Sequence, residues 1–229
     1  MSNPQMSGRL DSVRERIEQA CSRAGRNVDS VRLIAVTKNH PASTLQDLID
    51  LGVRDLGENR VQEIEEKVPQ LRGEFTMHMI GHLQTNKAQK VLPLVEWIQS
   101  VDREKLILRL EKLIGDGPKK RVLLEVNTSG EEAKSGCAPQ ECAELCERIR
   151  ESSALELRGL MTIGPLGGNE ADVRNAFSLL RSLAEKNCSF LEKPEISMGM
   201  SGDFEWAIEE GATMVRIGTL LVGERKRKL

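Results

Sequence analysis

The residues with the clearest chemical potential in this sequence are one lysine and two clusters of glycine with hydroxyl side chains. Lys38 follows a short apolar run, Leu33–Val36, with only Thr37 between them. An amine beside apolar walls loses hydration and becomes a better nucleophile. The alternative is a lysine whose stem packs on the surface while its amine reaches water. Lys38 is therefore a candidate for covalent attachment to a carbonyl compound.

The two clusters, Met200–Asp203 and Arg216–Thr219, each combine glycine with Ser or Thr. Glycine lets backbone amides approach an anion closely, and a hydroxyl adds another donor. Together the clusters fit a phosphate, although each alone is compatible with ordinary turn chemistry. A nucleophilic amine and a phosphate site indicate a phosphorylated aldehyde held as a Schiff base, and pyridoxal 5′-phosphate (PLP) is such a compound.

Arg216 indicates what chemistry such a cofactor would do. A carboxylate beside the pyridine nitrogen keeps that nitrogen protonated and makes the ring a strong electron sink. Arginine stays charged and only donates hydrogen bonds, so it favours an unprotonated ring nitrogen. We expect PLP held by Arg216 to stabilise carbanions poorly.

The apolar pattern predicts the elements that position these residues. Short apolar strands alternate with helices, which is typical of a parallel sheet buried on both faces. The expected strands are Leu33–Val36, Val53–Leu56, Thr76–Ile80, Trp97–Ser100, Val122–Val126, Leu157–Met161, Glu195–Met198 and Met214–Ile217. Eight such units close a (β/α)8 TIM barrel, and an open doubly wound sheet is the alternative. An additional N-terminal helix, with apolar positions from Leu10 to Ala24, should plug or flank the bottom of the barrel.

Barrel active sites lie at the carboxyl ends of the strands, and phosphate sites often use the loops after strands seven and eight. The predicted strands place Lys38 after the first strand, Ser201 after the seventh, and Gly218 and Thr219 after the eighth. The loop after the fourth strand contains Asp102, which we expect to cap the next helix.

Two histidines flank the end of the third strand. His78 and His82 share a face if the strand continues between them. They are interpreted as hydrogen-bonded structural residues, with a proton carrier at His82 as the alternative. Because the sequence indicates no third ligand, we expect no metal site here.

Length and composition permit one domain and exclude some classes of partner. The chain has 229 residues, within the range of about 200–250 for one barrel, and shows no linker, so we expect a single domain over residues 1–229. Its net charge of −2 indicates neither a nucleic acid nor an anionic membrane as partner. No run approaches the ~20 apolar residues of a membrane span. A polar start and five cysteines, an odd number, favour a cytoplasmic protein without disulfides, in which Cys142 and Cys146 serve packing.

The sequence resembles the pyridoxal-phosphate homeostasis protein family, a relative of the barrel domain of alanine racemase. The matching stretches are Ala35–Lys38, Gly57–Arg60, His78–Gln84, Val126–Glu131, Gly159–Met161, Ser197–Ser201 and Arg216–Thr219, in order along nearly the whole chain. The resemblance implies PLP on Lys38 and phosphate contacts at Ser201, Gly218 and Thr219. It also implies a ring-nitrogen contact at Arg216 and a further cofactor contact at Asn59.

Three functions remain open at this stage. The first is a PLP carrier in PLP homeostasis without robust catalysis, with apo-PLP enzymes as possible clients. The second is a PLP-dependent amino-acid racemase, and the third is an aldolase-type barrel enzyme that uses Lys38 on a phosphorylated sugar. Alanine racemase pairs its lysine with a tyrosine from a partner subunit, and this chain has no tyrosine. We therefore expect a carrier rather than a racemase. We also expect a monomer, because the sequence shows no second domain that would build a shared active site.

Overall fold

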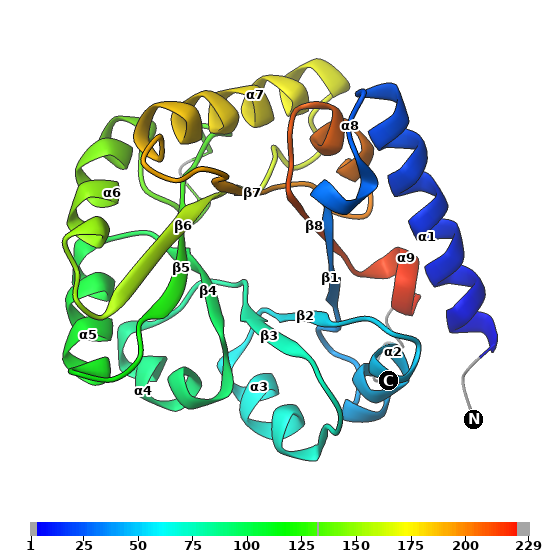
Figure 1. The fold of residues 1–229 in the computed structure, drawn as a ribbon, viewed down its shortest axis with the longest axis horizontal. Helices are drawn as coiled ribbons and strands as arrows, with labels where there is room; N and C mark the ends of the chain where they lie inside the picture. The colour runs from blue at the N-terminus through cyan, green and yellow to red at the C-terminus, as the bar shows by residue number, and fades with distance from the viewer. Residues whose placement is uncertain (1–3, 132, 224–229) are drawn as a thin grey trace.

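The computed structural model describes residues 4–131 and 133–223, and within them the chain forms a closed parallel barrel. Each strand pairs with its neighbours in sequence, and β1 pairs with β8 to close the ring (Figure 1). The strands are β1 Arg32–Val36, β2 Asp55–Glu58, β3 Thr76–Met79, β4 Trp97–Val101, β5 Lys120–Glu125, β6 Leu155–Met161, β7 Glu195–Ser197 and β8 Met214–Ile217. The predicted (β/α)8 barrel is confirmed, and the open sheet is excluded.

Helices surround the barrel on its outer side (Figure 1). They are α1 Pro4–Arg23, α2 Ala42–Asp50, α3 Val61–Lys67, α4 Ala88–Val91, α5 Glu104–Ile114, α6 Cys142–Arg150, α7 Glu170–Asn187, α8 Phe204–Glu209 and α9 Thr219–Val222. The main apolar core lies between this ring and the strands. Helix α1 packs on α8 and α9 at the side of the barrel, so it flanks the barrel rather than plugging its bottom.

A second, smaller apolar cluster fills the barrel interior. Five strands each contribute one buried member to it: Ile34, Trp97, Leu123, Met161 and Met214. Inward-facing residues alternate with outward-facing ones along each strand of a barrel. The residues two positions further along β5 and β8, Glu125 and Arg216, therefore face inward one layer closer to the carboxyl ends of the strands. This layer forms the floor of the barrel mouth.

The structure corrects two local predictions. Strand β2 runs over Asp55–Glu58 rather than Val53–Leu56, so Glu58 is a fully buried strand residue. Between β3 and β4, α4 is a single α-turn flanked by two 3-10 turns, since Pro93 cannot continue an α-helical ladder. Asp102 does not cap α5, because Arg103 is the N-cap and Asp102 instead pairs with the Arg103 guanidinium.

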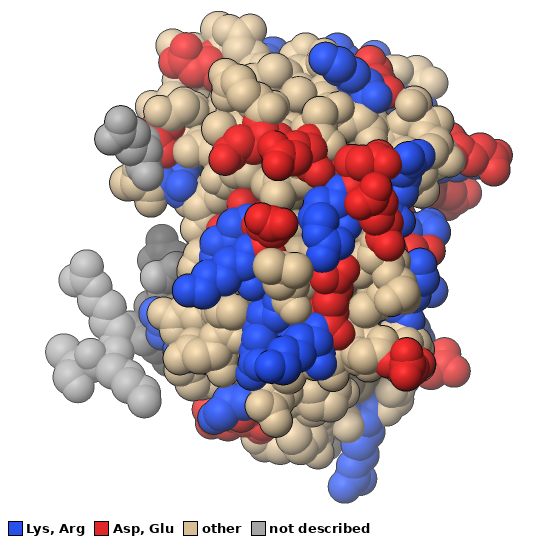
Figure 2. All heavy atoms as spheres, turned by 90° about the vertical axis from the view of Figure 1, so that its left-hand side faces the viewer, with Lys and Arg blue, Asp and Glu red and all other residues tan. Residues whose placement is uncertain are grey.

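The outer surface carries charges of both signs. On the face shown in Figure 2, acidic and basic side chains are interspersed. One ion pair on the helical ring joins α6 to α5, with Arg148 Nη2 2.5 Å from Glu111 Oε2. Cys142 and Cys146 are buried in α6, as their predicted packing role requires. Among the helices of residues 4–131 and 133–223, none combines the length and apolarity needed to cross a membrane.

Candidate functional site

A cavity of about 260 Å³ opens at the carboxyl ends of β1, β2, β7 and β8. All six residues predicted to contact a cofactor line it: Lys38, Asn59, Ser201, Arg216, Gly218 and Thr219. Its volume is close to the lower end of small-molecule sites, about 300–1,000 Å³. Residues that are far apart in the sequence thus meet in one concave site.

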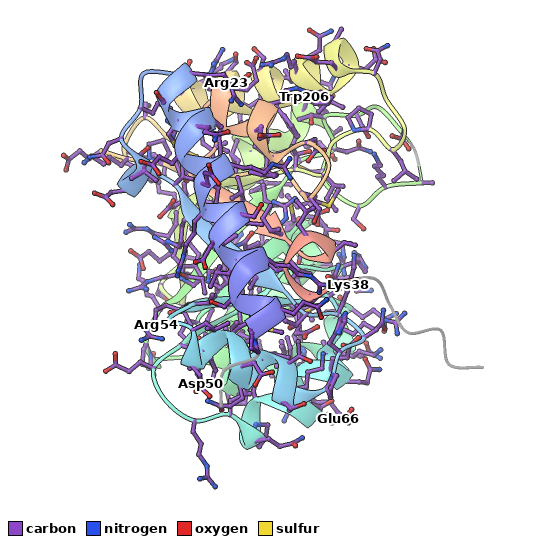
Figure 3. All side chains as sticks on the ribbon, turned by 90° about the vertical axis from the view of Figure 1, so that its right-hand side faces the viewer. Arg23, Lys38, Asp50, Arg54, Glu66 and Trp206 are labelled. Carbon is purple, nitrogen blue, oxygen red and sulfur yellow. The ribbon has the colours of Figure 1, made fainter. Side chains whose placement is uncertain are left out.

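Lys38 enters the site from the loop after β1. It is half-buried and lines the cavity beside Val36, an inward-facing residue of the same strand. Figure 3 shows Lys38 near α9 and Arg54, which precedes β2, on the opposite side of the molecule. Lys38 therefore lies at the mouth of the barrel, as predicted.

The loops after β7 and β8 form the wall with hydroxyl groups and glycine. Ser201 Oγ accepts the Gly218 N–H at 3.2 Å, so the two loops are tied together. Gly199 has φ +88, and a Cβ there would lie 2.5 Å from the Ala207 Cβ, so only glycine fits this turn. Gly202 has open space around its Cα. An anion could thus approach the backbone closely at this wall.

Arg216 projects from β8 into the mouth and is almost fully buried. Its Nη1 donates to Ser197 Oγ at 2.7 Å and its Nη2 donates to the Thr162 carbonyl at 2.8 Å. Burial lowers the pKa of Arg216 to about 10, although Glu125 and Asp203 oppose the shift. The guanidinium therefore remains a cation at neutral pH and offers its remaining N–H groups to the cavity.

A chain of hydrogen bonds continues from Arg216 through the barrel interior. Ser197 Oγ donates to Gln99 Oε1 at 2.7 Å, and Gln99 Nε2 lies 3.0 Å from His78 Nδ1. His78 Nε2 lies 2.9 Å from Asp55 Oδ1 at the other end of the barrel. Burial lowers the pKa of His78, so the ring is neutral, accepts from Gln99 and donates to Asp55. His78 is thus a hydrogen-bonded structural residue.

One predicted cofactor contact, Asn59, has a polar side-chain atom without a hydrogen-bond partner. Its Oδ1 atom is buried and has no hydrogen-bond partner, and the residue lines the cavity. A buried amide oxygen without a partner is costly, so a donor from a bound ligand would stabilise it. This observation supports Asn59 as a ligand contact.

Several residues of the mouth were missed by the sequence analysis. His40 lines the cavity, two positions after Lys38. Glu125 ends β5 in the layer of Arg216, and burial raises its pKa to about 7, assisted by Asp102. His82, already named as an alternative proton carrier, has its Nδ1 3.3 Å from Asp102 Oδ2. Only the position of Glu125 at a strand end could have signalled a role.

The residues present fit a phosphorylated pyridine aldehyde. The cavity combines an amine, a buried guanidinium, two hydroxyls, glycine backbone and one unpaired amide oxygen. Ile80 and Ile163 supply apolar contact for a ring. Within the described part of the chain, no group of three His, Cys, Asp or Glu residues could hold a metal ion.

A parallel barrel with a mouth lysine, a buried arginine and a hydroxyl-rich wall defines the class of PLP-type barrel domains. The profile of the alanine racemase N-terminal domain family matches residues 9–226. The pyridoxal phosphate homeostasis protein of Aquifex aeolicus is 43% identical over 95% of this chain and 97% of its own length. The human protein of that name is 39% identical over 94% of this chain and 85% of its own. The chain belongs to the pyridoxal phosphate homeostasis protein family.

Solved structures agree with this assignment. A protein from Bifidobacterium adolescentis superposes with a TM-score of 0.90 at 39% identity and covers 95% of this chain and 94% of its own. PipY of Synechococcus elongatus with PLP bound has a TM-score of 0.83 at 35% identity, over 95% of this chain and 100% of its own. Alanine racemase from Corynebacterium glutamicum, at 17% identity and a TM-score of 0.68, covers 96% of this chain and 62% of its own and shares the fold alone.

Proposed function

We propose that this protein binds PLP through a Schiff base on Lys38 and serves in intracellular PLP homeostasis, without robust catalysis. One observation carries the proposal: the six residues expected at a PLP site line one cavity at the barrel mouth. The names of the relatives and the PLP-bound structure of PipY support it.

Each residue has a distinct role in this proposal. PLP supplies an aldehyde that can condense reversibly with amines. Lys38 provides the amine, while Ser201, Thr219 and the backbone at Gly218 bind the phosphate. Arg216 donates to the ring nitrogen and keeps it unprotonated. Withholding that proton weakens carbanion stabilisation, which suits storage and delivery better than fast catalysis.

The proposal is tested by the absorption spectrum of the purified protein. Protein incubated with PLP and then freed of excess cofactor should retain a visible band that borohydride removes. A protein that retains no PLP after this treatment would contradict the proposal. An aldolase-type enzyme acting on a phosphorylated sugar would likewise retain no chromophore.

We also propose a single-domain monomer that works in the cytoplasm, with apo-PLP enzymes as clients. The large hydrophobic side chains that are exposed come from separate segments: Val28, Leu108, Leu166, Leu179 and Phe190. Such scattered residues are normal for a monomer surface. Light scattering gives the mass, and reactivation of an apo-PLP enzyme by the PLP-loaded protein tests delivery. An amino-acid racemase is the second candidate, because the alanine racemases share the fold.

A further inference from the structure

The backbone that carries Lys38 is a tight turn. The Thr37 carbonyl accepts the His40 N–H at 3.0 Å, which places Lys38 second and Asn39 third in a four-residue β-turn. Asn39 has φ +64, the left-handed conformation that a type II turn needs at its third position and that asparagine tolerates better than most residues. The direction of the Lys38 side chain therefore depends on what holds this turn.

Two charged side chains of α3 hold the turn on either side of Lys38. Lys67 Nζ donates to the Thr37 carbonyl at 3.0 Å, and Glu63 Oε2 accepts the Asn39 N–H at 2.7 Å. Glu63 and Lys67 also pair with each other at 2.6 Å. They are four residues apart with the acid first, the favourable order on a helix. One ion pair thus fixes the peptide groups that precede and follow Lys38.

Glu58 on β2 completes this cluster. Its Oε1 atom accepts from Lys67 Nζ at 2.7 Å and from Thr37 Oγ1 at 2.6 Å. The three protons of the Lys67 ammonium group thus have three acceptors, on Thr37, Glu58 and Glu63. Lys67 is 4% exposed and Glu58 is 0% exposed. All three N–H donors of the Lys67 ammonium group are therefore used, and these hydrogen bonds fix its position.

Burying such a cluster does not by itself stabilise a fold. Desolvation of buried ion pairs offsets much of their attraction, and apolar residues in their place often preserve stability. What this cluster does provide is a fixed geometry around one peptide segment. Among the described residues that line the cavity, none belongs to the Glu58–Glu63–Lys67 cluster, so direct ligand contact does not account for it.

We infer that Lys67, together with Glu58 and Glu63, is a positioning residue that holds the turn of residues 37–40 so that the Lys38 amine is presented to the cavity. The inference rests on the proposed function, in which Lys38 is the lysine that binds PLP. It assigns a role to α3, which contributes no residue to the cavity lining and acts through the backbone of residues 37–40.

The test compares two reactions of variants freed of cofactor. One is the rate at which Lys38 captures PLP covalently, followed by the visible band. The other is the affinity for pyridoxine 5′-phosphate, which has the ring and the phosphate but no aldehyde. In Lys67→Met the capture rate should fall by about 10–100-fold, because a displacement of about 1 Å can cost about 10²-fold in rate. The affinity for pyridoxine 5′-phosphate should stay within a factor of about two, since its contacts are untouched.

Lys67→Met leaves two carboxylates near each other without a cation and could fail to fold. A second variant, Glu58→Gln with Lys67→Met, reduces this problem, because it buries no unpaired charge at residue 58, while the Glu63 side chain is 13% exposed and still accepts the Asn39 N–H. This variant should also capture PLP more slowly while its affinity for pyridoxine 5′-phosphate stays the same. Lys67→Arg, which restores the cation, should recover part of the capture rate. Arg148→Met, which breaks the pair with Glu111 between α5 and α6, is the matched control and should change neither reaction.

The outcomes separate the inference from the proposed function. If the unmodified protein captures no PLP on Lys38, the proposed function fails. If it does, but the double variant captures PLP at the same rate, the positioning role is wrong. A parallel loss of capture and pyridoxine 5′-phosphate affinity would also overturn it, because that pattern indicates general damage to the site.

Discussion

Arg216 Nη1 donates a hydrogen bond of 2.7 Å to Ser197 Oγ, from β8 to the neighbouring strand β7 inside the barrel. Because Ser197 accepts from a cation, its own proton points to Gln99 Oε1. The amide group of Gln99 then donates to His78, and His78 donates to Asp55. The donor and the acceptor of each of these hydrogen bonds are thus determined. This series of hydrogen bonds fixes the Arg216 guanidinium, which we propose faces the cofactor ring.

Breaking the chain at Gln99 should loosen Arg216. Gln99→Leu leaves the buried Ser197 hydroxyl proton without its acceptor and His78 Nδ1 without its donor, which should cost about 1–3 kcal/mol of unfolding free energy. PLP retention should weaken as well, because Ser197, which accepts from Arg216, is no longer held by Gln99. Denaturant unfolding and PLP titration measure the two effects. Gln70→Ala, at an exposed position, is the control. Unchanged PLP affinity in Gln99→Leu would show that Arg216 needs no such support.

The hydroxyls of the phosphate wall should contribute to PLP retention separately from covalent attachment. Ser201→Ala and Thr219→Val each remove a donor that we propose binds the phosphate. A hydrogen bond to a charged group contributes about 1.5–3 kcal/mol, so each variant should lose about tenfold or more in affinity. The borohydride-sensitive band should still form at high PLP concentration. Equal dissociation constants for both variants and for an exposed control, Ser12→Ala, would place the phosphate elsewhere.

Glu125 should make stability fall as pH rises. Burial raises its pKa from 4.5 to about 7, so the folded protein holds a proton that the unfolded chain has lost between those pH values. The stability linked to Glu125 is therefore complete below pH 4.5 and decreases until about pH 7. The shift corresponds to about 3 kcal/mol. Glu125→Gln should match the unmodified protein near pH 4.5 and exceed its stability by up to that amount at pH 8.

Denaturant unfolding across this pH range provides the measurement. Glu144→Gln, an exposed substitution on α6, should leave the pH profile unchanged. If Glu125→Gln and the unmodified protein have parallel pH profiles, the Glu125 pKa is the same in the folded and unfolded states, and the buried-acid interpretation is wrong.

The sequence was informative about strand order and about residues at strand ends. Lys38, Ser201 and Thr219 could be placed because a parallel barrel brings all strand ends to one mouth. The buried partners could not be found in this way. Lys67 looks like any helical lysine, and two of its three acceptors, Thr37 and Glu58, lie outside its helix. Placing β2 two residues early also made Glu58 seem a loop residue, when it is a buried strand residue that holds Lys67.

The protein should not racemise amino acids at an enzymatic rate. Racemisation needs a base on each face of the α-carbon, and the chain has no tyrosine to pair with Lys38. A missing general base costs about 10²–10⁴-fold, and Arg216 further weakens carbanion stabilisation. Incubation with L-alanine or L-serine in D₂O, followed by α-deuteration and optical rotation, measures this. Turnover near ~1–10³ per second would establish the racemase candidate instead. Slow exchange without inversion would fit a one-base site.

Identification of the lysine that binds PLP tests the account most directly. The PLP-loaded protein is reduced with borohydride, digested and analysed by mass spectrometry, with Lys38→Ala treated in parallel. Lys38→Ala should fold, because Lys38 is half-buried at the mouth and adds little to the core. The account predicts the pyridoxyl group on the peptide that contains Lys38 and its loss in Lys38→Ala. A pyridoxyl group found mainly on another lysine, in the unmodified protein, would contradict it.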